Sequence, residues 1–296
     1  MNLRAVGEDE LMRRLAPHLP LGRHVISGAG DDCAVAEFAG SEKLLLLKTD
    51  CVVEGVHFTA RAKPSAVGWK AMARPLSDFA AVSGLPQFAL VTLIAPPTTT
   101  LRWTTELYRG LTKAARAFGV TIVGGETSRI DGPVAISISL TGQVEKDRWV
   151  SRRGGKAEDD LFVTGRLGRS IRGKHLRFIP RIKESRWLTT HFPIHAMMDL
   201  SDGLGADLPR LARASQLAYK VDESAIPRTR GCSIEQAISD GEDYELLFAI
   251  APSDAAALQK AWKKKFPTLP LTRIGRLNRK SKIETPKFPI GYVHFQ

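Results

Sequence analysis

The sequence predicts an α/β (α+β) fold built from two domains. The chain has 296 residues, and a globular domain commonly contains about 100–200 residues. Strand patterns and helix patterns occur in both halves of the chain, which is typical of layered α/β architectures. A polar, basic stretch over residues 145–160 separates the halves. We therefore expect an N-terminal domain over residues 1–147 and a C-terminal domain over residues 148–296.

The N-terminal half contains four predicted strands and two predicted helices. Short apolar runs between turn residues indicate strands at 44–48, 88–95, 120–123 and 134–140. The first of these strands should end at Thr49-Asp50. Apolar residues at helical spacing predict helices over 65–83 and 104–118, and Gly119 should end the second. Pro75 lies inside the first helix and should kink or split it, because proline has no backbone N–H.

The C-terminal half continues the mixture of strands and helices. The same patterns predict strands at 161–164, 196–198 and 244–250. They also predict a helix over 204–214 and a helix over 254–264, the latter capped by Ser253. Residues 166–185 are basic and have no regular period, so we expect irregular structure there.

Composition excludes several classes of protein. Hydrophobic residues make up 43% and charged residues 25%, which is ordinary for a globular protein and too apolar for a disordered one. No apolar run approaches the roughly 18 residues of a membrane span, and residues 1–14 do not resemble a secretory signal. The three cysteines form no C-x-x-C pair, which disfavours a disulfide framework or a zinc module. We expect a cytoplasmic protein without a membrane partner.

The net charge of +12 favours an anionic ligand or partner. Phosphorylated small molecules and nucleic acids both fit this charge, and a solvated basic surface explains it equally well. The densest basic stretches, residues 166–183 and 273–282, contain no interleaved aromatic residues for base stacking. This pattern disfavours a nucleic-acid partner.

The positions of the acidic residues are more informative than the basic excess. Most lie at predicted strand ends or in glycine turns, where side chains converge on clefts. These are Asp31, Asp32, Asp50, Asp78, Glu126, Asp199, Asp202, Glu242 and Asp243. For each alone, a role as a turn or cap residue is the more frequent explanation, and Asp202 is placed to cap the helix at 204. If they converge, however, two like charges about 4 Å apart repel by about 4 kcal/mol, so a cation is needed. Carboxylates without a histidine or cysteine cluster select Mg²⁺, which points to phosphoryl transfer.

Glycine segments offer backbone N–H groups to a phosphate, although glycine is also the default turn residue. One segment, Gly168 to His175, nearly matches the phosphate-binding pattern G-x-x-x-x-G-K-[ST]. Histidine replaces the hydroxyl residue that would hold Mg²⁺, and no long helix follows. We therefore do not expect a P-loop.

A series of short motifs runs in one order over nearly the whole chain. The motifs are G-D-D-C-A (30–34), T-D-C-V-V-E-G-V-H-F (49–58), L-S-D-F-A-A (76–81), G-G-E-T (124–127), R-R-G-G-K (152–156), V-T-G (163–165), D-L-S-D-G-L (199–204), G-E-D-Y-E-L (241–246) and G-Y-V-H-F (291–295). With these motifs the chain resembles the thiamine-monophosphate kinases, within the aminoimidazole-ribonucleotide-synthetase-like ATP-binding superfamily.

The resemblance implies transfer of a phosphoryl group from ATP to thiamine monophosphate with Mg²⁺. It implies a homodimer joined through an N-terminal mixed-sheet domain, with a C-terminal α/β domain completing the site. The implied catalytic residues are Asp50, Asp202 and Arg152. The implied metal ligands are Asp32, Thr49, Asp50, Asp78, Glu126, Asp199 and Asp202. The implied ATP contacts are Lys48, Thr49, Gly125, Arg152 and Ser201. The implied thiamine-phosphate contacts are His57, Glu242 and Tyr292.

Three departures from the family pattern leave alternatives open. Glu126 stands where the family has aspartate, and Lys48 stands where a small hydroxyl residue is usual. The segment between Gly165 and Asp199 is shorter and more basic than in the family. Two other functions remain: a related ATP-dependent enzyme with a different small acceptor, and an ATP-binding or nucleic-acid-binding homologue with weakened or lost catalysis.

Overall fold

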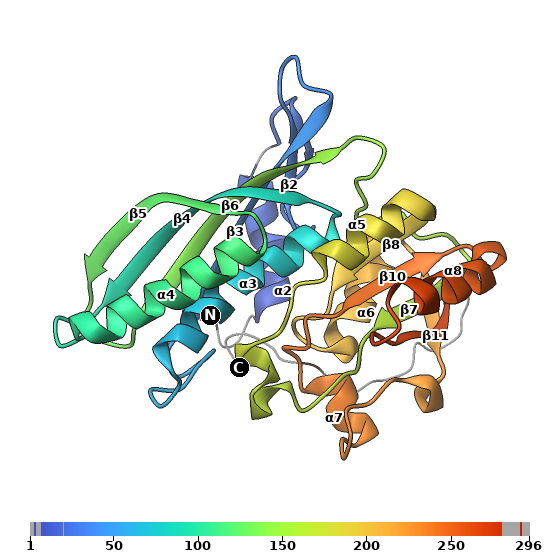
Figure 1. The fold of residues 1–296 in the computed structure, drawn as a ribbon. Coiled ribbons are helices and arrows are strands. Elements are labelled where there is room, and N and C mark those ends of the chain that lie inside the picture. The colour runs from blue at the N-terminus through green and yellow to red at the C-terminus, as the bar shows by residue number, and fades with distance from the viewer. Residues whose placement is uncertain (1–2, 4–6, 20, 280–290, 292–296) are drawn as a thin grey trace.

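The chain folds into two halves, each built on its own sheet (Figure 1). The structure is a computed structural model and describes residue 3, residues 7–19, residues 21–279 and residue 291. Within this part of the chain, no helix is long and apolar enough to cross a membrane. The two-domain mixed α/β fold predicted from the sequence is confirmed.

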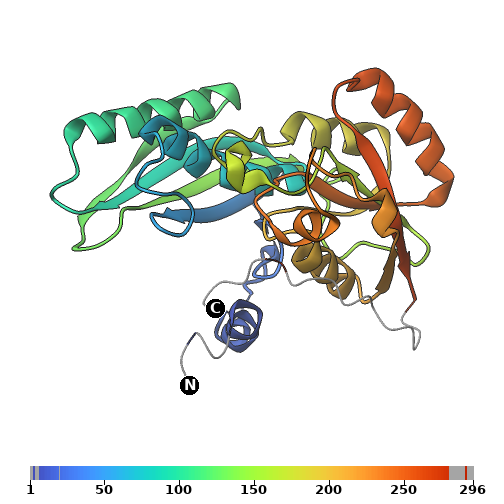
Figure 2. The ribbon, with the colours of Figure 1, turned by 90° about the horizontal axis from the view of Figure 1, so that it is seen from below.

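The N-terminal half carries a six-stranded mixed sheet in the order β1-β2-β3-β6-β4-β5. Only β4 and β5 pair in parallel, and the other neighbours are antiparallel. Its elements are α2 (Glu8–Leu15), the 3-10 helix η1 (Ala16–His18), β1 (Val25–Ser27), β2 (Ala34–Glu37), β3 (Lys43–Val53), α3 (Pro64–Ala81), β4 (Leu85–Ala95), α4 (Leu101–Ala117), β5 (Thr121–Arg129) and β6 (Ala135–Glu145). Helices α3 and α4 lie together on one face of this sheet (Figure 2).

The C-terminal half carries a five-stranded antiparallel sheet in the order β8-β10-β7-β11-β9. Its elements are β7 (Asp160–Thr164), the 3-10 helices η2 (Ser170–Arg172) and η3 (Lys174–Leu176), α5 (Ile182–His191), β8 (Ile194–Asp199), α6 (Leu204–Ala214), β9 (Ala218–Val221), the 3-10 helix η4 (Glu223–Ala225), α7 (Ile234–Ser239), β10 (Leu246–Ile250), α8 (Pro252–Lys265) and β11 (Leu271–Asn278).

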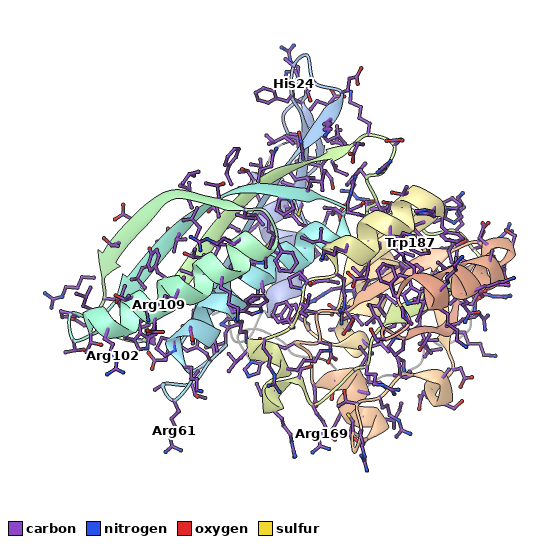
Figure 3. All side chains as sticks on the ribbon, viewed as in Figure 1. His24, Arg61, Arg102, Arg109, Arg169 and Trp187 are labelled. Carbon is purple, nitrogen blue, oxygen red and sulfur yellow. The ribbon has the colours of Figure 1, made fainter. Side chains whose placement is uncertain are left out.

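One hydrophobic core joins the two halves. Helix α3 packs on α4 and on its own sheet, and also contacts α5 and β8 of the C-terminal half. Trp187 of α5, labelled in Figure 3, meets Trp262 of α8 and Phe266, the C-cap of α8, edge-on at ring distances of 5.9 and 5.6 Å. Because α3 packs against elements of both halves, the residues along this helix lie between the two sheets. The domain boundary at 147/148 stays a prediction, and it falls between β6 and β7.

Several predicted element boundaries are wrong. The strand expected to end at Asp50 continues to Val53, because β3 pairs with β6 along its full length. Pro75 does not split α3, which runs unbroken from Pro64 to Ala81 with most of its side chains buried on both sides of the proline. Proline removes one helical hydrogen bond, and this burial offsets that loss.

Two further corrections concern the C-terminal half. Ser253 does not cap α8, because Pro252 is already the first helical residue and Ala251 is the N-cap. The basic segment 166–185 contains η2 and η3 and the start of α5, so it is more regular than expected. By contrast, Gly119 directly follows Phe118, the C-cap of α4, and has a φ of +71°, as predicted for a glycine at a helix end.

Candidate active site

A pocket of about 770 Å³ is lined by residues from both halves of the chain. The N-terminal half contributes Lys48, Asp50 and Asp78, while the C-terminal half contributes Arg152 and Asp202. Side chains of α2 also line the pocket. The acidic motifs that are scattered along the sequence therefore meet at one place.

Three buried carboxylates form the centre of the site. Asp32, Asp78 and Asp199 each place an oxygen so that the three atoms lie within 4.8 Å of one another. Asp32 follows a turn in which Gly30 has a φ of +103°, a conformation that favours glycine. Asp78 comes from α3, and Asp199 is the last residue of β8. The carboxylates thus come from three elements that the fold brings to one point.

Burial makes this carboxylate cluster electrostatically unfavourable without a cation. Burial and the charge of Asp32 raise the pKa of Asp199 to about 7. Burial likewise raises the pKa of Asp78 well above its usual range, although Lys48 acts in the opposite direction. Burial also opposes ionisation of Asp50, but Lys48 and Arg74 outweigh it and lower the pKa of Asp50. The cluster is therefore a place where a bound cation would be stabilised.

Fixed cations already compensate part of this charge. Lys48 Nζ donates to Asp78 Oδ1 at 2.7 Å. Arg152 binds the carboxylate of Asp32 with two parallel hydrogen bonds, from Nε at 3.1 Å and from Nη2 at 2.5 Å. Ser77 Oγ donates to Asp199 Oδ2 at 2.6 Å. These contacts hold the carboxylates in place and tie the two halves of the chain together.

Asp202 is paired and does not cap the following helix. The N-cap of α6 is Gly203, and it makes no side-chain cap hydrogen bond. The carboxylate of Asp202 accepts from Arg210, while its backbone N–H donates to Asp207 Oδ2 at 3.0 Å. Asp202 and its neighbour Ser201 both line the pocket.

A second polar group, centred on Lys70, lies on the same helix as Asp78. The Lys70 side chain is fully buried, and its ammonium donates to the His57 carbonyl oxygen at 2.6 Å and to the carboxylate of Glu242. His175 Nδ1 lies 3.0 Å from both Lys70 Nζ and Glu242 Oε2. Burial lowers the pKa of Lys70 to about 8, although Glu242 opposes this. The group connects two of the predicted thiamine contacts, which come from different halves of the chain.

The G-E-D-Y-E-L loop is held in an unusual conformation. Glu242 and Tyr244 have φ values of +55° and +52°, a backbone conformation that residues other than glycine rarely adopt. Backbone hydrogen bonds from Glu242 to Ser201 at 2.6 Å and from Tyr244 to Leu200 at 2.8 Å maintain it. These hydrogen bonds hold the loop backbone in a strained conformation, and strained backbone is common at functional sites.

The segment that nearly matches a P-loop supports this loop. Gly168 donates its backbone N–H to both carboxylate oxygens of Asp243 at 3.0 Å, and Ser170 donates its hydroxyl to the same carboxylate. His175 contacts Glu242, as described above. The segment forms two short 3-10 helices, so the sequence argument against a P-loop agrees with its structure.

Besides His57 and Glu242, which belong to the Lys70 group, three predicted site residues lie away from both the pocket and the carboxylate cluster within the single chain. Thr49 points to the opposite face of β3 from Lys48 and Asp50, and its hydroxyl lies 3.4 Å from that of Ser137. Glu126 is exposed on β5, which is three strands away from β3.

The third residue, Gly125, also lies on β5. A β-carbon at Gly125 would lie 1.8 Å from the carbonyl oxygen of Val91, so glycine is needed there for strand packing. A fourth residue, Tyr292, lies outside the described residues. The roles assigned to all four stay predictions.

Two residues of the site were missed by reasoning from the sequence. Lys70 and Arg74 line up with Asp78 at intervals of four residues on α3, so all three lie along one side of the helix. The sequence signal for these two residues was a row of charged residues in an otherwise apolar helix. Such a row within a buried helix indicates a polar site rather than a solvated face.

Comparison with known proteins defines the class of the molecule. The family described as AIR synthase related protein, N-terminal domain, matches residues 30–144, and the corresponding C-terminal domain family matches residues 149–285. The chain is therefore a two-domain protein related to AIR synthase. Residues of both domains line the pocket.

The similarity to individual proteins is more specific. Thiamine-monophosphate kinase of Rhodopirellula baltica is 36% identical, over 91% of this chain and 92% of the relative. The enzyme of Aquifex aeolicus is 32% identical, over 90% of this chain and 92% of the relative. A solved structure described as AaThiL complexed with AMPPCP and TMP has a TM-score of 0.85 and 31% identity, and covers 99% of both chains. The chain belongs to the thiamine-monophosphate kinase family.

Proposed function

We propose that the protein phosphorylates thiamine monophosphate with ATP and forms thiamine diphosphate. The observation that carries this proposal is the convergence of Asp32, Asp78 and Asp199 in a pocket lined from both domains. Family membership supports the same reaction, and the related AaThiL structure is described as a complex with AMPPCP and TMP. Phosphoryl transfer requires that a nucleotide and a phosphorylated acceptor bind together, and one carboxylate-lined pocket can hold both.

The donor set of the pocket fits Mg²⁺. Only carboxylate oxygens converge in the cluster of Asp32, Asp78 and Asp199, and such hard ligands suit Mg²⁺ better than Zn²⁺. The raised pKa of Asp199 reflects repulsion and burial that a divalent ion would relieve. We assign these three residues as the centre of a magnesium site, with Asp50 and Asp202 as neighbouring ligands. Bound Mg²⁺ would neutralise charge on the transferred phosphoryl group.

The residues of the chain mainly bind and orient the two substrates. The acceptor phosphate is already deprotonated at neutral pH, so the reaction needs no strong general base. Arg152 and Lys48 supply fixed positive charge at the edge of the pocket where ATP phosphates would bind. Ser201 offers a hydroxyl beside them. The contacts that hold Arg152 and Lys48 in the free protein keep both groups oriented before ATP arrives.

Recognition of thiamine is assigned to residues near the Lys70 group. Glu242 lies in the strained loop and is held by Lys70 and His175, so its carboxylate is fixed in position for a thiamine ring. His57 is part of the same group through its carbonyl oxygen. Tyr292 remains the predicted stacking partner of the ring.

We propose a homodimer formed through the uncovered face of the N-terminal sheet. Helices α3 and α4 cover one face, and Figure 2 shows the other face without these helices. Leu47, Phe88 and Leu90 project from that other face and remain 42–49% exposed. Adjacent exposed apolar residues on one sheet face mark an interaction surface. Thr49 shares this face, so a second chain would bring it close to new groups. Light scattering should give a dimer mass, and Leu90→Lys should give monomers.

We propose a cytoplasmic location, because the three cysteines of the sequence form no C-x-x-C pair and no disulfide framework is expected. The proposed reaction is tested with a panel of acceptors in the presence of ATP and Mg²⁺. Thiamine monophosphate, unphosphorylated thiamine and unrelated monophosphates are compared by chromatography of the products. Only thiamine monophosphate should be converted efficiently. Preference for another acceptor, or ATP binding without turnover, would instead support one of the two alternatives raised by the sequence.

A further inference from the structure

Arg74 occupies the middle of the charged side of α3. Lys70 lies four residues before it and Asp78 four residues after it. Because an α-helix rises 1.5 Å per residue, each interval is about 6 Å along the axis. Lys70 contacts Glu242 and His57 at the predicted thiamine end, whereas Asp78 belongs to the carboxylate cluster. Arg74 therefore stands between the metal end and the thiamine end of the site.

The guanidinium of Arg74 lines the pocket but is only partly satisfied by the protein. Nη1 donates to the carbonyl oxygen of Cys51 at 2.9 Å. Nη2 lies 3.9 Å from Asp50 Oδ1, which is longer than a hydrogen bond. Nε is buried and has no hydrogen-bond partner. Buried donors without partners are rare in folded proteins, and Nε and Nη2 form the edge that arginine uses to bind phosphates bidentately.

We infer that Arg74 binds the phosphate group of the acceptor, an inference that rests on the proposed kinase function. A phosphorylated acceptor whose ring contacts Glu242 must extend its phosphate toward the nucleotide and the metal. The guanidinium is the positively charged group at the middle of that path. Binding there would satisfy the Nε–Nη2 edge and would make the site prefer thiamine monophosphate over thiamine. Arg74 is thus assigned as a specificity residue for the phosphorylated form.

Affinity measurements on two ligands and two variants test this assignment. Calorimetry with AMPPCP and Mg²⁺ present compares thiamine monophosphate with unphosphorylated thiamine, for the wild type and for Arg74→Met. We expect Arg74→Met to weaken thiamine monophosphate binding about 10- to 100-fold, as for loss of charge-assisted hydrogen bonds, and thiamine binding less than about threefold. Arg74→Lys keeps the charge without the bidentate edge and should lose an intermediate amount.

A matched control is Arg102→Met, since Arg102 lies at the start of α4, at the far end of the N-terminal half from the C-terminal sheet (Figure 3). It should leave both affinities unchanged. If Arg74→Met fails to fold, as judged by its melting temperature and AMPPCP affinity, Arg74→Lys carries the test. Equal weakening of both ligands, or no weakening of either, would overturn the role of Arg74. A wild type that binds AMPPCP but does not prefer thiamine monophosphate over thiamine would overturn the proposed function itself.

Discussion

Replacing Arg152 by methionine should destabilise the metal-free protein strongly at neutral pH. Arg152 is the bidentate partner of Asp32, whose side chain is only 1% exposed. The variant leaves a buried carboxylate without its counter-charge, and such losses typically cost about 3–5 kcal/mol. We expect a loss of about 3–5 kcal/mol at pH 7.5, or a melting temperature lowered by roughly 6–20 °C.

Urea denaturation in EDTA at pH 7.5, followed by tryptophan fluorescence, measures this loss. The double variant Arg152→Met/Asp32→Asn is the matched control, because it removes both charges of the pair. It should recover most of the stability that Arg152→Met loses at pH 7.5. A loss below about 1 kcal/mol at pH 7.5, or a double variant that is no more stable than Arg152→Met, would refute the reasoning.

Three other variants test separate parts of the site. Burial raises the pKa of Asp199 to about 7, so the contribution of Asp199 to wild-type stability falls as pH rises from about 4 to 7. Metal-free Asp199→Asn should therefore exceed wild type in stability by up to about 4 kcal/mol at pH 8, with no excess near pH 4, in denaturant titrations. Gly125→Ala would place a β-carbon 1.8 Å from the Val91 carbonyl oxygen and should lower the melting temperature even without nucleotide. Lys70→Met removes the buried partner of Glu242 and should raise KM for thiamine monophosphate about tenfold in steady-state kinetics, with KM for ATP unchanged.

Local patterns predicted part of the fold, but the elements α2, β1, β2, α5, β9 and β11 were not predicted. The helices α3 and α4 and the central strands were visible because their apolar residues recur at helical or strand spacing. The end of β3 was not visible, because residues beyond Asp50 are held in the sheet by pairing with β6, which is distant in the sequence. The short helix α7 was missed, although the pair Ser233 and Gln236 forms a capping box that the sequence displays.

The composition of the site was easier to predict than its arrangement. Acidic residues at turns and strand ends indicated a cation site, and Asp32, Asp78 and Asp199 do converge. The ion pairs that hold them depend on which elements pack together, and no local pattern reveals this. Thr49 shows the limit most clearly, since it neighbours Lys48 and Asp50 in sequence but points to the other face of β3 because strand side chains alternate.

The most direct test of the account is the formation of thiamine diphosphate from thiamine monophosphate, ATP and Mg²⁺, measured by chromatography. Wild type and the variants Asp50→Asn and Asp202→Asn are compared under identical conditions. We predict product formation by the wild type, at on the order of 1–100 turnovers per second, and none by either folded variant. Full activity in both variants, or no product from a wild-type protein that binds AMPPCP, would contradict the account.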